Sequence, residues 1–299
     1  AWAYATAGVE APDLFVAIAK EASRKMTTFT AQNLANVAWA YASAEFEAPL
    51  LFAAVGLESS KKLATFNAQE LANVAWAFAT ARVAAPALFD KVAELAPNLM
   101  HLFRPQELSI LALAFSRAGV AAPELFEAVA KETSKKLAAF KPQALGNTVW
   151  AFAKAGIAAP KLFNAVAARV PIYVSLFKPQ ELSNVVWAFA TAKAEAPLLF
   201  EAVCAEAAGR IATFNAHDVS NTVWAYAKAG FPAPLLFDAV AVDAPAKISR
   251  FPAQALSNTV WAYARSGHAS PHLFESVAAE ALKKMDSFNA QALANTAWA

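Results

Sequence analysis

The sequence predicts an all-α fold: an α-α superhelix, built as a right-handed solenoid of two-helix repeats of 37 residues. Two kinds of observation predict it. Strand-like alternation of polar and apolar residues is absent, and tryptophan, proline and phenylalanine each recur at one fixed interval without an insertion. One tryptophan step spans two periods, and its midpoint is Leu113. The tryptophans are Trp2, Trp39, Trp76, Trp150, Trp187, Trp224, Trp261 and Trp298.

The period divides the 299 residues into one predicted helical-repeat array, 1–299, with no internal linker. Because the array begins and ends in mid-repeat without polar caps, we interpret the chain as a window from a longer array. The partial repeats are 1–28 and 288–299, and the full repeats are 29–65, 66–102, 103–139, 140–176, 177–213, 214–250 and 251–287.

The first helix of each repeat begins at a capping signal and ends near a glycine. Asn67 is followed three residues later by Glu70, the spacing of a capping box. Pro142 and Pro179 occupy the first helical position in two other repeats. Gly119 stands at a typical C-terminal stop, as do its equivalents one period apart in several repeats.

The second helix begins at the periodic proline, as at Pro123, and is predicted to continue to about Leu137. Its apolar residues fall on one face, which is the pattern of an amphipathic outer helix. We expect the opposite, solvent-facing side to carry Glu127, Lys131, Glu132, Lys135 and Lys136.

Composition excludes several protein classes. The chain is 58% hydrophobic and 16% charged with a net charge of +2, which argues against disorder. Its mean hydropathy of +0.36 raises the question of a membrane span. The longest uncharged run, 26–44, contains Gln32, Asn33 and Asn36, so we expect no membrane partner. The single cysteine, Cys204, has no partner for an internal disulfide.

A polar and aromatic stripe follows one side of the first helix. In repeat 140–176, Leu145, Thr148, Val149 and Phe152 share one face, and the stripe occupies the other. Amides hydrogen-bond base edges, aromatic rings stack on bases and basic groups neutralise phosphates, so the stripe suits single-stranded RNA. Its candidate residues are Gln143, Asn147, Trp150, Lys154, Gln180, Asn184, Trp187, Asn221, Trp224, Lys228, Gln254, Asn258, Trp261 and Arg265.

Each stripe position also has a structural interpretation. A tryptophan at this spacing more often packs between neighbouring repeats than stacks on a ligand. The asparagine either satisfies neighbouring backbone and indole groups or contacts a ligand, and the glutamine near the helix start could be a cap. In repeat 103–139 the asparagine and tryptophan are replaced together, by Ile110 and Leu113, which suggests that the two side chains touch.

Charge is segregated within the first helix. Two columns, the last stripe position and the position two residues before the glutamine, hold seven bases and no acids. Acids collect beside the stripe at Glu70, Glu107, Glu181 and Asp218, and on the outer helix. In stacked helix pairs the first helix usually lines the concave surface, so we expect RNA to bind in a groove along that concave face. The net charge of +2 therefore conceals a basic line along the expected groove. The seven bases are Arg104, Lys141, Lys178, Arg117, Lys154, Lys228 and Arg265.

No catalytic constellation is present, and we predict a protein that is not an enzyme and has no cofactor, metal or small-molecule substrate. The histidines are His101, His217, His268 and His272. His268 and His272 lie in a loop between a glycine and a proline, without a nearby cysteine or acid cluster, so a zinc site is not expected. Phosphate-binding glycine motifs are also absent.

Two segments carry a family resemblance: Phe66-Asn-Ala-Gln-Glu-Leu-Ala-Asn-Val-Ala-Trp-Ala-Phe-Ala79 and Leu256-Ser-Asn-Thr-Val-Trp-Ala-Tyr-Ala264. They resemble octotricopeptide repeats and the related heptatricopeptide repeats of organellar RNA-binding proteins, and more distantly the helical repeats of FAST-kinase-domain proteins. The resemblance covers the whole chain. It implies RNA stability, processing or translation functions in a chloroplast or mitochondrion. The proline-rich motif of octotricopeptide repeats is present only as variants such as 122–126, and the RAP domain of many relatives is absent.

Three hypotheses follow. The chain is a single-stranded RNA adaptor reading about one base per repeat, or on the order of eight nucleotides. Alternatively it is a protein- or peptide-binding scaffold, since asparagine–tryptophan rows resemble the armadillo grip on an extended peptide. A basic stripe would then require an acidic peptide. The third hypothesis is an inert structural array with no dedicated ligand.

Overall fold

The computed structural model describes the backbone of residues 2–299 and the side chains of residues 3–299, so the side chain of Trp2 lies outside the described residues. The predicted all-α solenoid fold is confirmed: α-helices and short 3₁₀ turns follow one another, and no strand occurs among the described residues. None of the described helices combines the length and apolarity needed to span a membrane.

The chain divides into two compact units, Ala1–Ala144 with Lys154–Leu162, and Leu145–Ala153 with Phe163–Ala299. Helices α9 (Pro142–Ala155) and α10 (Pro160–Arg169) contribute to both. The first unit contains α1 (Trp2–Ala7), α2 (Pro12–Lys25), α3 (Ala31–Ser43), α4 (Pro49–Lys62), α5 (Ala68–Thr80), α6 (Pro86–Leu99), α7 (Pro105–Ala118) and α8 (Pro123–Lys136). The second contains α11 (Pro179–Ala192), α12 (Pro197–Gly209), α13 (Ala216–Ala229), α14 (Pro234–Lys247), α15 (Ala253–Ser266), α16 (Pro271–Lys283) and α17 (Ala290–Trp298).

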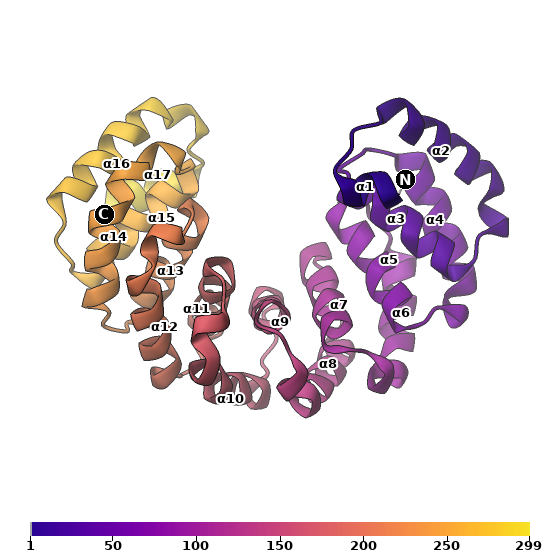
Figure 1. Ribbon diagram of the computed structural model, residues 1–299, viewed down its shortest axis with the longest axis horizontal. Coiled ribbons are helices and arrows are strands. Elements are labelled where there is room, and N and C mark those ends of the chain that lie inside the picture. Colours follow the sequence, from indigo (N-terminus) through magenta and orange to yellow (C-terminus); the bar gives the residue numbers. More distant parts are fainter. Residues whose placement is uncertain (1) are drawn as a thin grey trace. The chain divides into compact units, whose positions relative to one another are not determined.

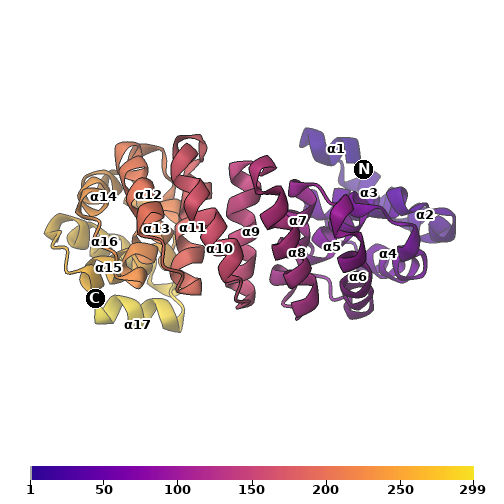
Figure 2. The same ribbon diagram turned by 90° about the horizontal axis from the view of Figure 1, so that it is seen from below.

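Within each unit the helices form two layers (Figures 1 and 2). In the second unit α11, α13, α15 and α17 are the first helices of successive repeats and pack closely on one another. The second helices α12, α14 and α16 form the other layer and pack less closely. The first unit repeats this arrangement with α3, α5 and α7 in one layer and α4, α6 and α8 in the other.

Small side chains allow the first helices to approach. From α3 to α15, one buried column contains only alanine, serine and glycine. At Gly146 a Cβ atom would lie 3.3 Å from the carbonyl oxygen of Glu181 in the next first helix, so even alanine is tight there. The other buried members of this column are Ala35, Ala72, Ser109, Ser183, Ser220 and Ser257.

Local capping follows the predicted pattern. The Asn67 side chain accepts from the backbone N–H of Glu70, and the Glu70 carboxylate accepts from the backbone N–H of Asn67, both at 2.9 Å. The predicted C-terminal glycines adopt the left-handed conformation, as at Gly119 with φ of 67°. Where glycine is missing, Glu45, Arg82 and Lys193 take that conformation instead.

One prediction about the outer helix is wrong. We expected Glu132 and Lys136 on its solvent face, but Glu132 is only 6% exposed. Lys136 Nζ lies 3.0 Å from the Glu132 carboxylate and also donates to the carbonyl oxygens of His101 and Phe103, at 2.8 and 2.7 Å. These carbonyls lie just before the first helix α7, so the bonds tie the end of the second helix to that segment.

We call this arrangement the carbonyl clamp, and it recurs with the repeat. A base at the end of the second helix binds an acid four residues earlier and a carbonyl about 33 residues earlier. Two repeats replace it. Leu95 and Leu99 occupy the two positions in one, and in the other the Arg169 guanidinium lies 4.9 Å from the Tyr173 ring centroid. The other clamps are Glu58–Lys62, Glu206–Arg210, Asp243–Lys247 and Glu280–Lys284.

Candidate functional site

The predicted stripe lies on the solvent-facing side of the first helices. Leu145, Thr148, Val149 and Phe152, which were assigned to the opposite face, are all buried. In the second unit Gln180 and Gln254 are exposed near the starts of α11 and α15. Asn184, Asn221 and Asn258 are half-buried one turn later, as are the tryptophans that follow them.

The tryptophans of the second unit form one continuous row of rings. The Trp187 centroid is 5.8 Å from that of Trp150 and 6.3 Å from that of Trp224, and the row continues to Trp261 and Trp298. In the first unit the centroids of Trp39 and Trp76 are 6.1 Å apart. These contacts are the inter-repeat packing that we considered the more common role of tryptophan at this spacing.

Ring spacing limits what the indoles can do to a base. A base inserted between two rings needs two van der Waals gaps, or about 7 Å between the rings. The centroids in the second unit are 5.8 to 6.3 Å apart, so the rings would have to separate before a base could enter. A ligand on this face therefore contacts the neighbouring amides and the exposed parts of the indoles, and does not insert between two rings at this spacing.

The amides are partly organised by one another. Gln254 Nε2 donates to Asn258 Oδ1 at 2.9 Å. Asn221 Nδ2 lies 3.2 Å from His217 Nε2, and His217 stands where other repeats carry glutamine. Each pair leaves hydrogen-bonding capacity for a ligand, because an amide offers two donors and an acceptor with two lone pairs.

The basic columns divide into bound and unbound side chains. Arg104 donates to the buried Glu107 carboxylate at 2.6 Å, so its charge is already compensated. Burial lowers the pKa of Arg117, although its side chain reaches solvent. Lys141 and Lys154 are exposed, and neither has a carboxylate at ion-pair distance within the described part of the chain.

In the second unit Lys178, Lys228 and Arg265 are exposed. Among the side chains that the structure describes, none of the three forms an ion pair. The Arg265 guanidinium lies 5.6 Å from the Trp261 ring centroid, which joins the base to the indole row. Lys178 lies at the start of α11, whereas Lys228 and Arg265 lie in the last turns of α13 and α15.

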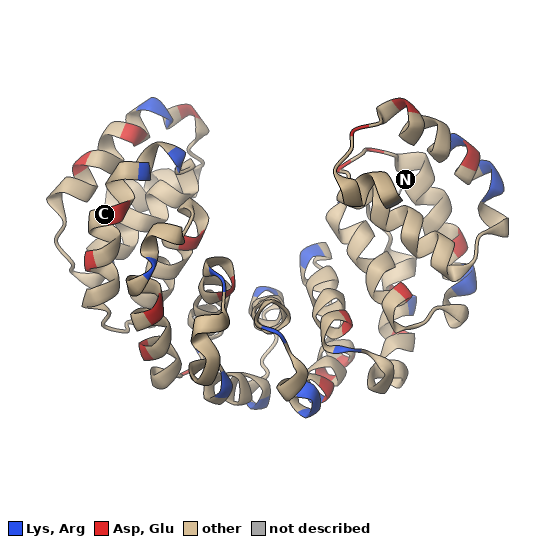
Figure 3. Cartoon of the chain, viewed as in Figure 1, with Lys and Arg blue, Asp and Glu red and all other residues tan. Residues whose placement is uncertain are grey.

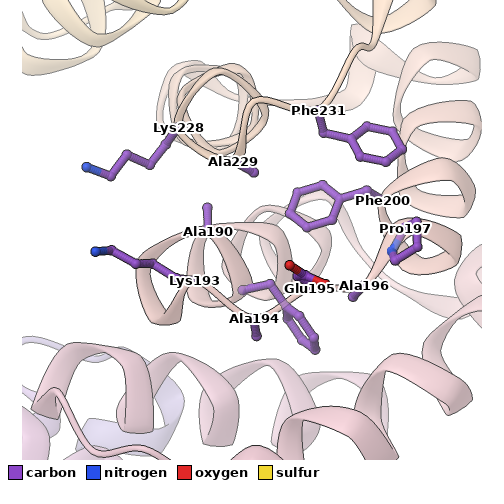
Figure 4. Close-up of a pocket in the computed structure, with 11 residues that line it drawn as sticks. Ala190, Lys193, Ala194, Glu195, Ala196, Pro197, Phe200, Lys228, Ala229 and Phe231 are labelled. Atoms are coloured by element: carbon purple, nitrogen blue, oxygen red, sulfur yellow. The ribbon is translucent and has the colours of Figure 1, made fainter.

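Sequence reasoning missed Lys193, which ends α11 in the left-handed conformation with φ of 53°. Lys193 and Lys228 both line a cavity of about 460 Å³, and their side chains extend in the same direction in Figure 4. The signal was present in the sequence, because Lys193 occupies the position that is glycine in five other repeats.

The four acids beside the stripe lie at the third positions of their helices, where Glu70 is half-buried and the other three are buried. The buried three are Glu107, Glu181 and Asp218. Burial raises the pKa of Asp218, and the bond from the Asn215 backbone N–H opposes this shift. Charged residues accordingly lie mainly on second helices and at helix ends, with the middles of the first helices uncharged (Figure 3).

The histidines, the cysteine and the carboxylates form no metal-binding cluster of three or more side chains among the described residues. His268 Nε2 lies 2.9 Å from an Asp238 carboxylate oxygen, while His272 does not share that contact. Cys204 is buried, and burial raises the pKa of its thiol, which makes the reactive thiolate scarcer.

Comparison with known proteins identifies a family. Residues 2–138 and 100–299 match the family model described as RNA-editing substrate-binding complex 6 protein. The chain belongs to this family. No curated protein matches the chain. The family match supports the RNA-related helical-repeat class expected from the sequence and gives no specific support to octotricopeptide or heptatricopeptide repeats.

Proposed function

We propose that this chain is a non-catalytic protein that binds single-stranded RNA along the solvent-facing side of its first helices. The single observation that carries the proposal is the row of exposed and half-buried amides, which is flanked by lysine and arginine side chains without ion pairs. The acids on this face act as helix caps. Amides hydrogen-bond the edges of nucleobases, and lysine and arginine side chains without ion pairs neutralise phosphates. Together they suit single-stranded RNA.

The family's description adds a cellular role to this geometry. It names RNA editing, a substrate and a complex, so we propose that the chain holds RNA for editing as part of a protein assembly. Of the roles implied by the resemblance, this favours processing over stability or translation. RNA-editing complexes are typically mitochondrial, so we propose the mitochondrion, and the match gives no support to the chloroplast.

The protein-scaffold alternative keeps one supporting observation. The asparagine and tryptophan rows are equally suited to an extended peptide, and a complex requires protein contacts. Capture of a protein partner that survives ribonuclease would show that such contacts exist. If that partner also competed with RNA for the Asn184, Asn221 and Asn258 face, the scaffold function would replace the RNA function there.

The proposal is tested by measuring binding of the 299-residue chain to labelled single-stranded RNA over a range of salt. We expect binding that weakens steeply with salt, and loss of binding when Lys154, Lys228 and Arg265 are all changed to glutamate. The matched control changes Lys20, Lys131 and Lys161 to glutamate, because these exposed lysines lie on second helices. Absence of RNA binding at low salt, or equal losses in both variants, would remove the proposed function.

A further inference from the structure

Three first helices of the second unit end in a basic side chain, although the residues come from different columns. Lys228 and Arg265 lie in the last turns of α13 and α15. In α11 the corresponding position is Thr191, and Lys193 follows it two residues later. In α11 the basic residue therefore stands two positions later in the sequence, but it still lies at the C-terminal end of the helix.

Lys193 adopts a left-handed backbone conformation, with φ of 53°, that is costly for lysine. Glycine adopts the left-handed region without penalty, and lysine does not. The equivalent positions in α13 and α15 are Gly230 and Gly267, with the same left-handed φ of 67°. Among α11, α13 and α15, only α11 lacks a basic residue at the preceding column. Glu45 and Arg82 take the same conformation at the equivalent positions of the first unit, so it is the place of Lys193 at the helix end, not its conformation, that suggests a ligand contact.

The surroundings of Lys193 and Lys228 favour an anion. Phe200 and Phe231, with ring centroids 5.4 Å apart, line the same cavity, and both lysine side chains extend away from these rings (Figure 4). Glu195 lines the same cavity, but it forms no ion pair with either lysine within the described part of the chain. The lysine charges are therefore left for a ligand.

The N-terminal ends of α11, α13 and α15 carry fewer basic side chains that are available to a ligand. Lys178 is the one basic cap at the starts of α11, α13 and α15, where Asn215 and Pro252 cap the other two. Nearby Arg210, Lys247 and Lys284 are held in carbonyl clamps. The corresponding cavity between α3 and α5 in the first unit is lined by Glu45 and Glu47 as well as Arg82, so it carries no excess of positive charge.

We infer that Lys193, Lys228 and Arg265 form a track for the sugar–phosphate backbone of the bound RNA, at the C-terminal ends of α11, α13 and α15. The inference rests on the proposed function and specifies which edge of the first-helix face holds the phosphates. The bases then point toward the amide rows, and Lys193 supplies the phosphate contact that Thr191 cannot make.

The test measures how the RNA dissociation constant of the full chain depends on salt. For single strands, each lost phosphate contact reduces the slope of log affinity against log salt by about 0.7. We expect Lys193→Gln and Lys228→Gln each to cause that reduction, and the double variant to cause about twice as much. Lys131→Gln, on an outer helix, should leave the slope unchanged, and Lys178→Gln, on the other edge of the first-helix face, should reduce it less than either track variant.

A glycine variant separates binding from folding. Lys193→Gly removes both the charge and the backbone strain, so we expect a higher melting temperature together with the reduced salt slope. Wild-type binding with an unaltered slope in the Lys193 and Lys228 variants would overturn the track and leave the RNA function standing. An equal reduction in Lys178→Gln would also overturn it, whereas a wild-type chain that does not bind RNA would instead refute the underlying function.

Discussion

The two ends of the first helices use the same residue types in opposite ways. At the N-terminal ends in the second unit, Arg210, Lys247 and Lys284 donate to backbone carbonyls and pair with acids four residues earlier. At the C-terminal ends, Lys193, Lys228 and Arg265 have no carboxylate partner among the described side chains. A basic side chain that recurs with the repeat can thus either stabilise the repeat or remain available to a ligand. Its contacts within the chain determine which role it has.

The largest expected effect comes from breaking a clamp. Lys136→Ala leaves the buried Glu132 carboxylate and the carbonyl oxygens of His101 and Phe103 without this donor, which we expect to cost about 2 kcal/mol of unfolding free energy. Lys135, 2.9 Å from Glu132, limits the loss. Urea unfolding measures it, with Lys131→Ala as a control that should change stability by less than about 0.5 kcal/mol.

This loss should depend on pH. Hydrogen bonds from Lys135 and Lys136 lower the pKa of Glu132, so the clamp stabilises the fold above the ordinary carboxylate pKa and loses that contribution as pH falls through the lowered value. The difference between wild type and Lys136→Ala should therefore shrink in acid. A difference that stayed constant or grew there would contradict the ion-pair account of the clamp.

A smaller effect of opposite sign is expected at a cap. Asp218→Asn removes a buried charge while keeping the capping geometry, since Asn33 fills the same position in α3 with a complete capping box. We expect a gain of about 1 kcal/mol at neutral pH. Because burial raises the pKa of Asp218, the gain should diminish as pH falls through that raised value and vanish below the ordinary aspartate pKa. Calorimetry at several pH values tests this, and a loss at neutral pH would refute it.

The smallest effect is expected when both members of a clamp are replaced. Leu95 and Leu99 show that the same two positions accept apolar residues within this chain. The double change Glu132→Leu with Lys136→Leu should therefore leave unfolding free energy nearly unchanged, since no charge is left buried alone. A loss as large as that of Lys136→Ala would mean that the carbonyl bonds, not the charge pairing, carry the clamp.

Most of the fold could be predicted because it follows from local signals repeated without interruption. The proline at the first position of each second helix and the boxes such as Asn67–Glu70 fix helix starts within the repeat itself. The face carrying Leu145 and Phe152 was equally predictable, since helical periodicity alone assigns it. Registration between repeats then follows from the period.

The partners of charged groups could not be predicted in the same way. A column count places Arg104 and Lys141 together, but only three-dimensional contacts show that Arg104 is bound to Glu107. Lys193 was missed because it lies outside the helical column, in a turn whose conformation the periodicity does not describe. The clamps did have a sequence signal, an acid four residues before a base, which a solvated helix face produces equally often.

The indole row has an optical consequence. In the second unit, five rings from Trp150 to Trp298 stand in an unbroken sequence with centroid spacings of 5.8 to 6.3 Å, close enough for their electronic transitions to couple. A solenoid changes its curvature by small rotations between adjacent repeats, and each rotation alters one ring-to-ring angle. Bending of the array should therefore change the near-ultraviolet circular dichroism of the tryptophan row, which can be measured without an added label.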